Sequence, residues 1–121
     1  MTDFRKLEVW NRAHALALNV HRVAMRLRGA EYLTLRSQMI RAAGSIDANI
    51  VEGSSQKSDA QFVRFLNIAV NSANELESHL IMAFDLRVMS QTDYVMLPTK
   101  PASDLRVVNL CLQSRYLLSF R

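Results

Sequence analysis

The stretch IRAAGSIDANIVEGSSQKSDAQF, residues 40–62, decides how this chain folds. Its apolar residues recur every three or four positions up to Ile50, which is the spacing of a helix that packs on one side. Gly53 and the two serines after it are typical of a helix end. Ser58, with Gln61 three residues later, forms a capping box that opens another helix. The stretch is therefore predicted to be the corner between two helices, not a catalytic loop.

The composition suits a single all-helical domain. The chain has 121 residues, of which 50% are hydrophobic and 21% charged, and it has only three glycines and two prolines. Cys111 is the only cysteine, so no intrachain disulfide can form. The sequence shows no signal peptide and no run of about 18 apolar residues. We therefore expect residues 1–121 to form one cytoplasmic domain that has no contact with a membrane.

Apolar periodicity on both sides of the corner predicts an all-α fold, an antiparallel up-down-up-down four-helix bundle. Proline disrupts the interior of a helix, so the fourth helix is expected to break near Pro98 and Pro101. The four helices are expected over residues 6–28, 34–52, 59–88 and 92–120. The core is expected to contain Trp10, Ile46, Phe65, Leu76 and Leu112.

Polar and small residues near the corner are predicted to set how its two helices meet. Glu52 falls in the last turn of its helix, where the helix dipole disfavours a carboxylate by about 0.3–1 kcal/mol, so a cation from across the corner should pair with it. The predicted structural latch consists of Asn49 and Glu52 with Lys57 or Arg64. Gly44 costs about 1 kcal/mol relative to alanine in a helix interior, which predicts close packing of another helix there.

Three segments carry a family resemblance: FRKLEVWNRAHALALNVHRV (4–23), SQMIRAAGSIDANIVEG (37–53) and KSDAQFVRFLNIAVNSANELESHL (57–80). They resemble the 23S rRNA-intervening-sequence proteins, small bacterial four-helix bundles that are often labelled ribosomal proteins. The resemblance implies assembly into a ring of five subunits. It also implies similarity to accessory proteins of diversity-generating retroelements, which have a basic surface and bind nucleic acid and a reverse transcriptase.

Carried over by position, the family motif falls on residues of both corner helices. In the first of them it covers Gln38, Arg41, Ala42, Ser45, Ile46, Asn49, Ile50, Glu52 and Gly53, and in the second Phe62, Arg64, Phe65, Glu75 and Glu77. The chain departs from the family at Gln56 and Lys57, where a basic pair is usual, at Asn71, where glycine is usual, and in its proline pair. These departures argue against an anion site at the corner and against the family's usual start of the fourth helix, but not against the bundle.

The sequence predicts neither catalysis nor a metal site. His14 and His21 are seven residues apart, not the four that would place two metal ligands on adjacent turns of a helix, and the third histidine, His79, lies far along the chain. No nucleophile with a neighbouring base and no phosphate-binding loop is visible. We therefore expect a protein that is not an enzyme and has no cofactor.

Charge is distributed unevenly and suggests a polyanionic partner. Lys+Arg against Asp+Glu is 8 to 3 in residues 1–41, 2 to 6 in residues 42–86 and 5 to 2 in residues 87–121. The predicted phosphate contacts are Arg5, Arg12, Arg22, Arg26, Arg36 and Arg41. An accessory protein that binds RNA or DNA with little sequence specificity is expected. The alternative is a scaffold module that binds another protein and no nucleic acid.

Surplus apolar residues predict a homo-oligomer. The first and fourth helices carry more apolar residues than one core can bury, and such surface is usually covered by another subunit. The predicted subunit contacts are Leu7, Leu18, Met25, Val107, Cys111 and Leu118. The family resemblance makes a pentamer the expected assembly.

Overall fold

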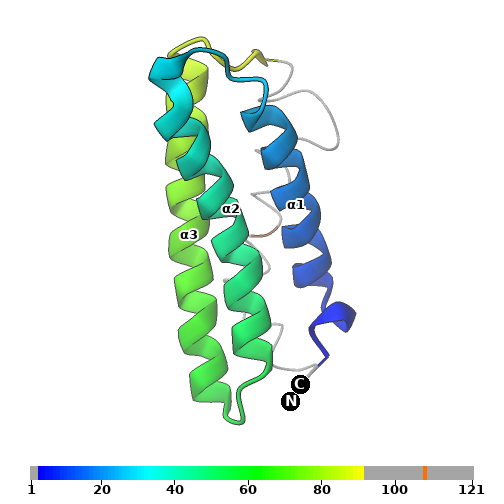
Figure 1. Ribbon diagram of the computed structural model, residues 1–121. Helices are drawn as coiled ribbons and strands as arrows, with labels where there is room; N and C mark the ends of the chain where they lie inside the picture. Colours follow the sequence, from blue (N-terminus) through cyan, green and yellow to red (C-terminus); the bar gives the residue numbers. More distant parts are fainter. Residues whose placement is uncertain (1–2, 92–107, 109–121) are drawn as a thin grey trace.

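The structure, a computed structural model, describes residues 3–91 and 108 (Figure 1). In this part of the chain every regular element is helical and there is no strand. The elements are η1 (Phe4–Lys6), α1 (Glu8–Ala24), η2 (Ala30–Tyr32), α2 (Leu33–Ser54) and α3 (Asp59–Asp85), where η marks a short 3-10 helix. The predicted all-helical class is confirmed for these residues. The predicted fourth helix, its break and Leu112 lie outside them, apart from Val108, which is helical and buried.

Short connections make α1, α2 and α3 run alternately up and down, with α2 in contact with both of the others (Figure 1). Each helix turns one apolar face inward. The fully buried side chains include Leu16 and Val20 of α1, Met39 and Ile46 of α2, and Phe62 of α3. No helix among the described residues is long and apolar enough to cross a membrane.

Of the predicted core residues that the structure describes, two are fully buried and two lie at the margin of the core. Ile46 and Leu76 are fully buried, as predicted. Trp10 and Phe65 are only partly buried. For Trp10 the physical reason is its indole N–H, which must keep a polar partner and therefore holds the ring at the margin of the core.

The glycine that permits close helix packing is Gly53, and the prediction for Gly44 is wrong. Gly53 lies inside α2, where a Cβ would sit 3.1 Å from the Phe65 Cβ and 3.4 Å from the Phe62 carbonyl oxygen. Apart from its chain neighbours and the backbone of its own helix, a Cβ on Gly44 would meet no atom of the described residues within 4 Å. The Ser58 cap is confirmed, since its hydroxyl oxygen accepts a hydrogen bond from the Gln61 backbone N–H at 3.2 Å.

Candidate nucleic-acid interface

Two of the predicted phosphate contacts are already paired with carboxylates. Arg5 lies 3.0 Å from Asp3, and Arg12 lies 3.0 Å from Glu8 one turn earlier on α1. Hydrogen bonds from the side chain and the backbone N–H of Arg5 hold the pKa of Asp3 below its usual range. These pairs reduce the charge that either arginine can offer to a phosphate.

The other four predicted arginines differ in how they are held. Arg22 and Arg41 are exposed, and neither forms an ion pair with a carboxylate of residues 3–91. Arg26 is also exposed. Arg36 is half-buried and donates a long hydrogen bond, 3.5 Å, to the carbonyl oxygen of Leu27, so it ties the start of α2 to the chain that follows α1.

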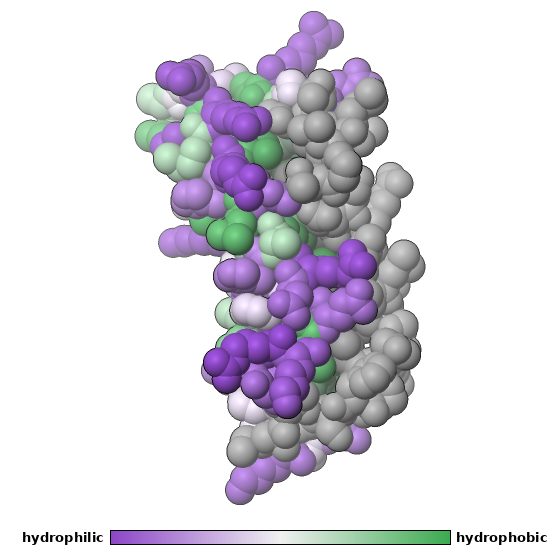
Figure 2. All heavy atoms as spheres, turned by 90° about the vertical axis from the view of Figure 1, so that its right-hand side faces the viewer, coloured by the Kyte–Doolittle hydropathy of each residue, from purple (hydrophilic) through white to green (hydrophobic). Residues whose placement is uncertain are grey.

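The antiparallel arrangement gathers arginines at one end of the bundle, which we call the basic end. It comprises residues 22–36 and 81–91, where α1 and α3 finish and α2 begins, at the top of Figure 1. Its carboxylates are those of Glu31 and Asp85, and its cations are Arg22, Arg26, Arg28, Arg36 and Arg87. Figure 2 looks onto the side where α1 lies and shows hydrophilic atoms at several levels along it, with apolar atoms between them.

Sequence reasoning missed Arg28 and Arg87 as members of this cluster. Arg28 follows α1 and is exposed. Arg87 is 59 positions further along, and only the return of α3 to the same end brings it near. Their positions in the sequence could have revealed both, because each arginine comes shortly after the end of a helix that finishes at the basic end.

Arg87 occupies a backbone conformation that usually belongs to glycine. Its φ is 61°, and it is the only residue other than glycine with a positive φ in the described chain. The Val88 N–H bonds to the Ala83 carbonyl oxygen and the Arg87 N–H to that of Phe84, which is the Schellman pattern that ends a helix. A side chain in this conformation costs about 1–2 kcal/mol. The position therefore carries a charged side chain at the expense of stability.

A second polar cluster joins α1 to α2 nearer the opposite end. The Asp47 carboxylate accepts a hydrogen bond from Trp10 Nε1 at 2.7 Å and lies 2.9 Å from His14 Nδ1 through its other oxygen. The two rings stack, with centroids 4.8 Å apart and planes inclined by 15°. Phe4 meets Trp10 edge to face at 5.0 Å. We call Phe4, Trp10 and His14 the aromatic stack.

The predicted latch at the corner does not form among the described residues. Glu52 is exposed and forms an ion pair with neither Lys57 nor Arg64. Water screens the charge of an exposed carboxylate, so Glu52 needs no cation beside it. Asn49 donates to the carbonyl oxygen of Ser45 at 2.7 Å and to its hydroxyl at 3.1 Å, within α2. The link to α3 is instead the hydrogen bond between the Ser45 and Ser72 hydroxyls, at 2.8 Å.

The predicted subunit contacts fall into three groups. Leu7 is only 3% exposed and belongs to the core, so its prediction is wrong: the turn between η1 and α1 directs it inward. Leu18 of α1 is 52% exposed, and Met25, which directly follows α1, is 53% exposed. Val107, Cys111 and Leu118 lie outside the described residues.

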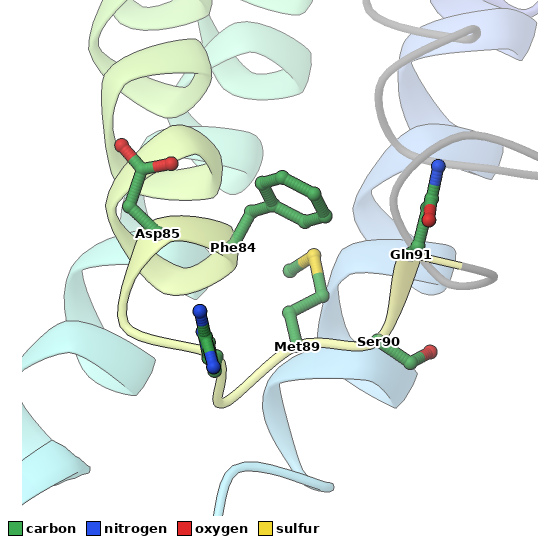
Figure 3. Close-up of a pocket in the computed structure, with 6 residues that line it drawn as sticks. Phe84, Asp85, Met89, Ser90 and Gln91 are labelled. Carbon is green, nitrogen blue, oxygen red and sulfur yellow. The ribbon is translucent and has the colours of Figure 1, made fainter.

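Metal ligation and a pocket also bear on the chemistry of residues 3–91. No three His, Cys, Asp or Glu side chains come together there as a metal site. A pocket beside the end of α3 is lined by Phe84, Asp85, Arg87, Met89, Ser90 and Gln91. In Figure 3, Phe84 and Met89 point toward each other and Asp85 points away. One outward carboxylate beside apolar side chains does not amount to an acid–base pair.

Comparisons with known proteins agree with this architecture. A solved structure from Bacteroides thetaiotaomicron VPI-5482, described as a protein of unknown function from the S23 ribosomal protein family, is 26% identical to this chain. It superposes with a TM-score of 0.78 over 88% of this chain and 95% of its own length. No curated protein matches. The sequence pattern of the 23S rRNA-intervening sequence proteins matches residues 5–102, and the chain therefore belongs to the 23S rRNA-intervening sequence protein family.

Proposed function

We propose that this protein is a non-enzymatic accessory protein that binds RNA or DNA through its basic end, without strong sequence preference. The observation that carries the proposal is that the described part of this end has five arginines, against the two carboxylates of Glu31 and Asp85; the arginines are Arg22, Arg26, Arg28, Arg36 and Arg87. Binding through phosphates follows from such a cluster, because each arginine that neutralises a phosphate releases a condensed counterion. A homo-oligomer, a pentamer as the family resemblance implies, would present the cluster several times to one strand.

Substituting serine for Arg22, Arg28 and Arg87 together is expected to weaken binding of both RNA and DNA by about tenfold or more at low salt. The slope of log K against log salt should flatten by about 2–3, because three phosphate contacts are lost. Fluorescence anisotropy over a salt series measures both quantities. The matched control changes Lys6, Lys57 and Arg64 to serine, which removes the same charge from the other end of the bundle. Equal losses in the two variants would refute a localised site.

Replacing Arg87 with glycine is expected to raise the free energy of unfolding by about 1 kcal/mol while it weakens nucleic-acid binding. Glycine adopts the positive φ at this position without strain, and the lost guanidinium removes one phosphate contact. Urea denaturation gives the first effect and anisotropy the second. Arg87→Ala separates the two, since it keeps the strained backbone and should lose binding without gaining stability. Unchanged binding in both variants would remove Arg87 from the interface.

The alternative, a scaffold module, is favoured by one observation. Apolar side chains at or beside the basic end are exposed, namely those of Met25, Leu33, Ile81, Met82 and Leu86. Such a surface suits a protein partner. Two results together would support this alternative over nucleic-acid binding. Retention of the protein on polyanions would not depend on salt, and a protein partner would no longer bind after Met82 and Leu86 are changed to serine.

A further inference from the structure

We propose that the exposed face of the His14 ring is a stacking site for an unpaired base of single-stranded nucleic acid. The inference rests on the proposed function and adds to it, because the basic end alone would hold a duplex and a single strand through their phosphates. A stacking site would give the protein a preference for single strands, since the bases of a duplex already stack on one another.

The ring of His14 is held in place on two sides. One face lies against the Trp10 indole, with centroids 4.8 Å apart and an interplanar angle of 15°. One edge is held by Asp47, 2.9 Å from Nδ1. The same carboxylate bonds the indole N–H at 2.7 Å, so a single residue of α2 orients both rings of α1. An aromatic ring that is already immobilised loses little conformational entropy when a base stacks on it.

The outer face of the ring is accessible. The His14 side chain is 49% exposed, whereas that of Asp47 is 20% exposed. Because Trp10 covers one face of the imidazole and Asp47 one edge, the exposed surface lies on the other face and on the remaining edge. Asp47 sits at the edge of the ring with each of its oxygens engaged by α1, so its charge is partly shielded from an approaching strand.

The charges along α1 fit a polyanionic strand better than an aromatic or cationic peptide. Arg22 lies eight residues after His14, about 12 Å further along the helix axis and about 80° around it. It is exposed and forms no ion pair with the described carboxylates. Between them on the same side, Leu18 is exposed and offers an apolar surface to a neighbouring base. A strand laid along α1 would therefore meet a base site at His14 and phosphate sites at the basic end.

The test compares three variants of the full chain on three probes. The probes are a short oligothymidylate, the same backbone with abasic sites, and a duplex of equal length. His14→Leu keeps an apolar side chain over Trp10 but has no ring on which a base can stack. It is expected to weaken oligothymidylate binding about tenfold and to leave the affinity for the other two probes unchanged. His14→Phe keeps a ring and should bind within about twofold of wild type. Ala15→Leu, on the exposed surface beside His14, is the control and should behave as wild type.

Each outcome separates this inference from the proposed function. If wild type binds none of the probes, the proposed function fails. If wild type binds all three with salt dependence and His14→Leu is unchanged on oligothymidylate, the proposed function stands and the stacking site is refuted. If His14→Phe loses as much as His14→Leu, the hydrogen bond to Asp47, and not the ring face, accounts for binding, and the stacking site is again refuted. Circular dichroism confirms that each variant keeps its helical content.

Discussion

Gly53→Leu is expected to lower the free energy of unfolding by about 3 kcal/mol. The first side-chain atom would already stand 3.1 Å from the Phe65 Cβ and 3.4 Å from the Phe62 carbonyl oxygen. Both atoms belong to or adjoin the α3 backbone, so they cannot rotate away as the end of a long side chain could. A leucine there forces α2 and α3 apart and opens the core around Phe62, and overpacking of this kind costs about 1–3 kcal/mol or more. Urea or thermal denaturation measures the loss.

The same substitution at Gly44 is the matched control, since it places an identical side chain in the same helix. A Cβ at Gly44 meets no described residue outside its own helix within 4 Å, and leucine is a better helix former than glycine. Gly44→Leu should therefore be neutral or raise the free energy of unfolding by up to about 1 kcal/mol. A loss as large as that of Gly53→Leu would mean that both faces of α2 are tightly packed.

Asp47→Ala is expected to cost about 2–3 kcal/mol of stability and to release the aromatic stack. The change leaves the partly buried indole N–H without its acceptor and removes the partner of His14. Hydrogen bonds to a charged group contribute about 1.5–3 kcal/mol, and an unsatisfied donor adds its desolvation cost. Because Trp10 is the only tryptophan, its fluorescence reports the change directly and should shift to longer wavelength.

Glu52→Ala provides the control for Asp47→Ala, because it removes a carboxylate from the same helix. Glu52 is exposed and has no ion pair with the described cations, so this variant should stay within about 0.5 kcal/mol of wild type. An unchanged tryptophan spectrum in Asp47→Ala would show that the ring stack does not depend on the carboxylate.

The spacing of apolar residues predicted the described helices well, because a helix that buries one face needs an apolar side chain every three or four positions. The start of α3 was placed correctly at Asp59, since the serine cap before it acts through a hydrogen bond three residues away. The ends of α1 and α3 were placed too late, since α1 finishes at Ala24 and α3 at Asp85, whereas the end of α2 was placed two residues too early, because α2 continues to Ser54. Buried Leu27 and Met89 continue the apolar pattern beyond each helix, although the backbone there has already turned.

The candidate site was predicted only in part, because charge is visible in sequence and pairing is not. Arg22 and Arg26 are exposed, as a phosphate contact requires, whereas the ion pairs of Arg5 and Arg12 depend on which rotamers meet. Asp47 was given no partner from the sequence, because its partners are 33 and 37 residues away on another helix. No local pattern connects residues at such a separation.

The sequence by itself determined the helical class, the existence of the corner between α2 and α3, and the inward faces of the three described helices. Each of these follows from interactions between residues at most four positions apart. Three features were decided only by the tertiary structure. Gly53, and not Gly44, is the glycine packed against another helix, and Asp47 is the carboxylate that holds the aromatic stack. Arg87 joins Arg22 and Arg28 at the basic end. Those outcomes depend on the distance and rotation between helices. These are set by packing over the whole interface, which no single segment encodes.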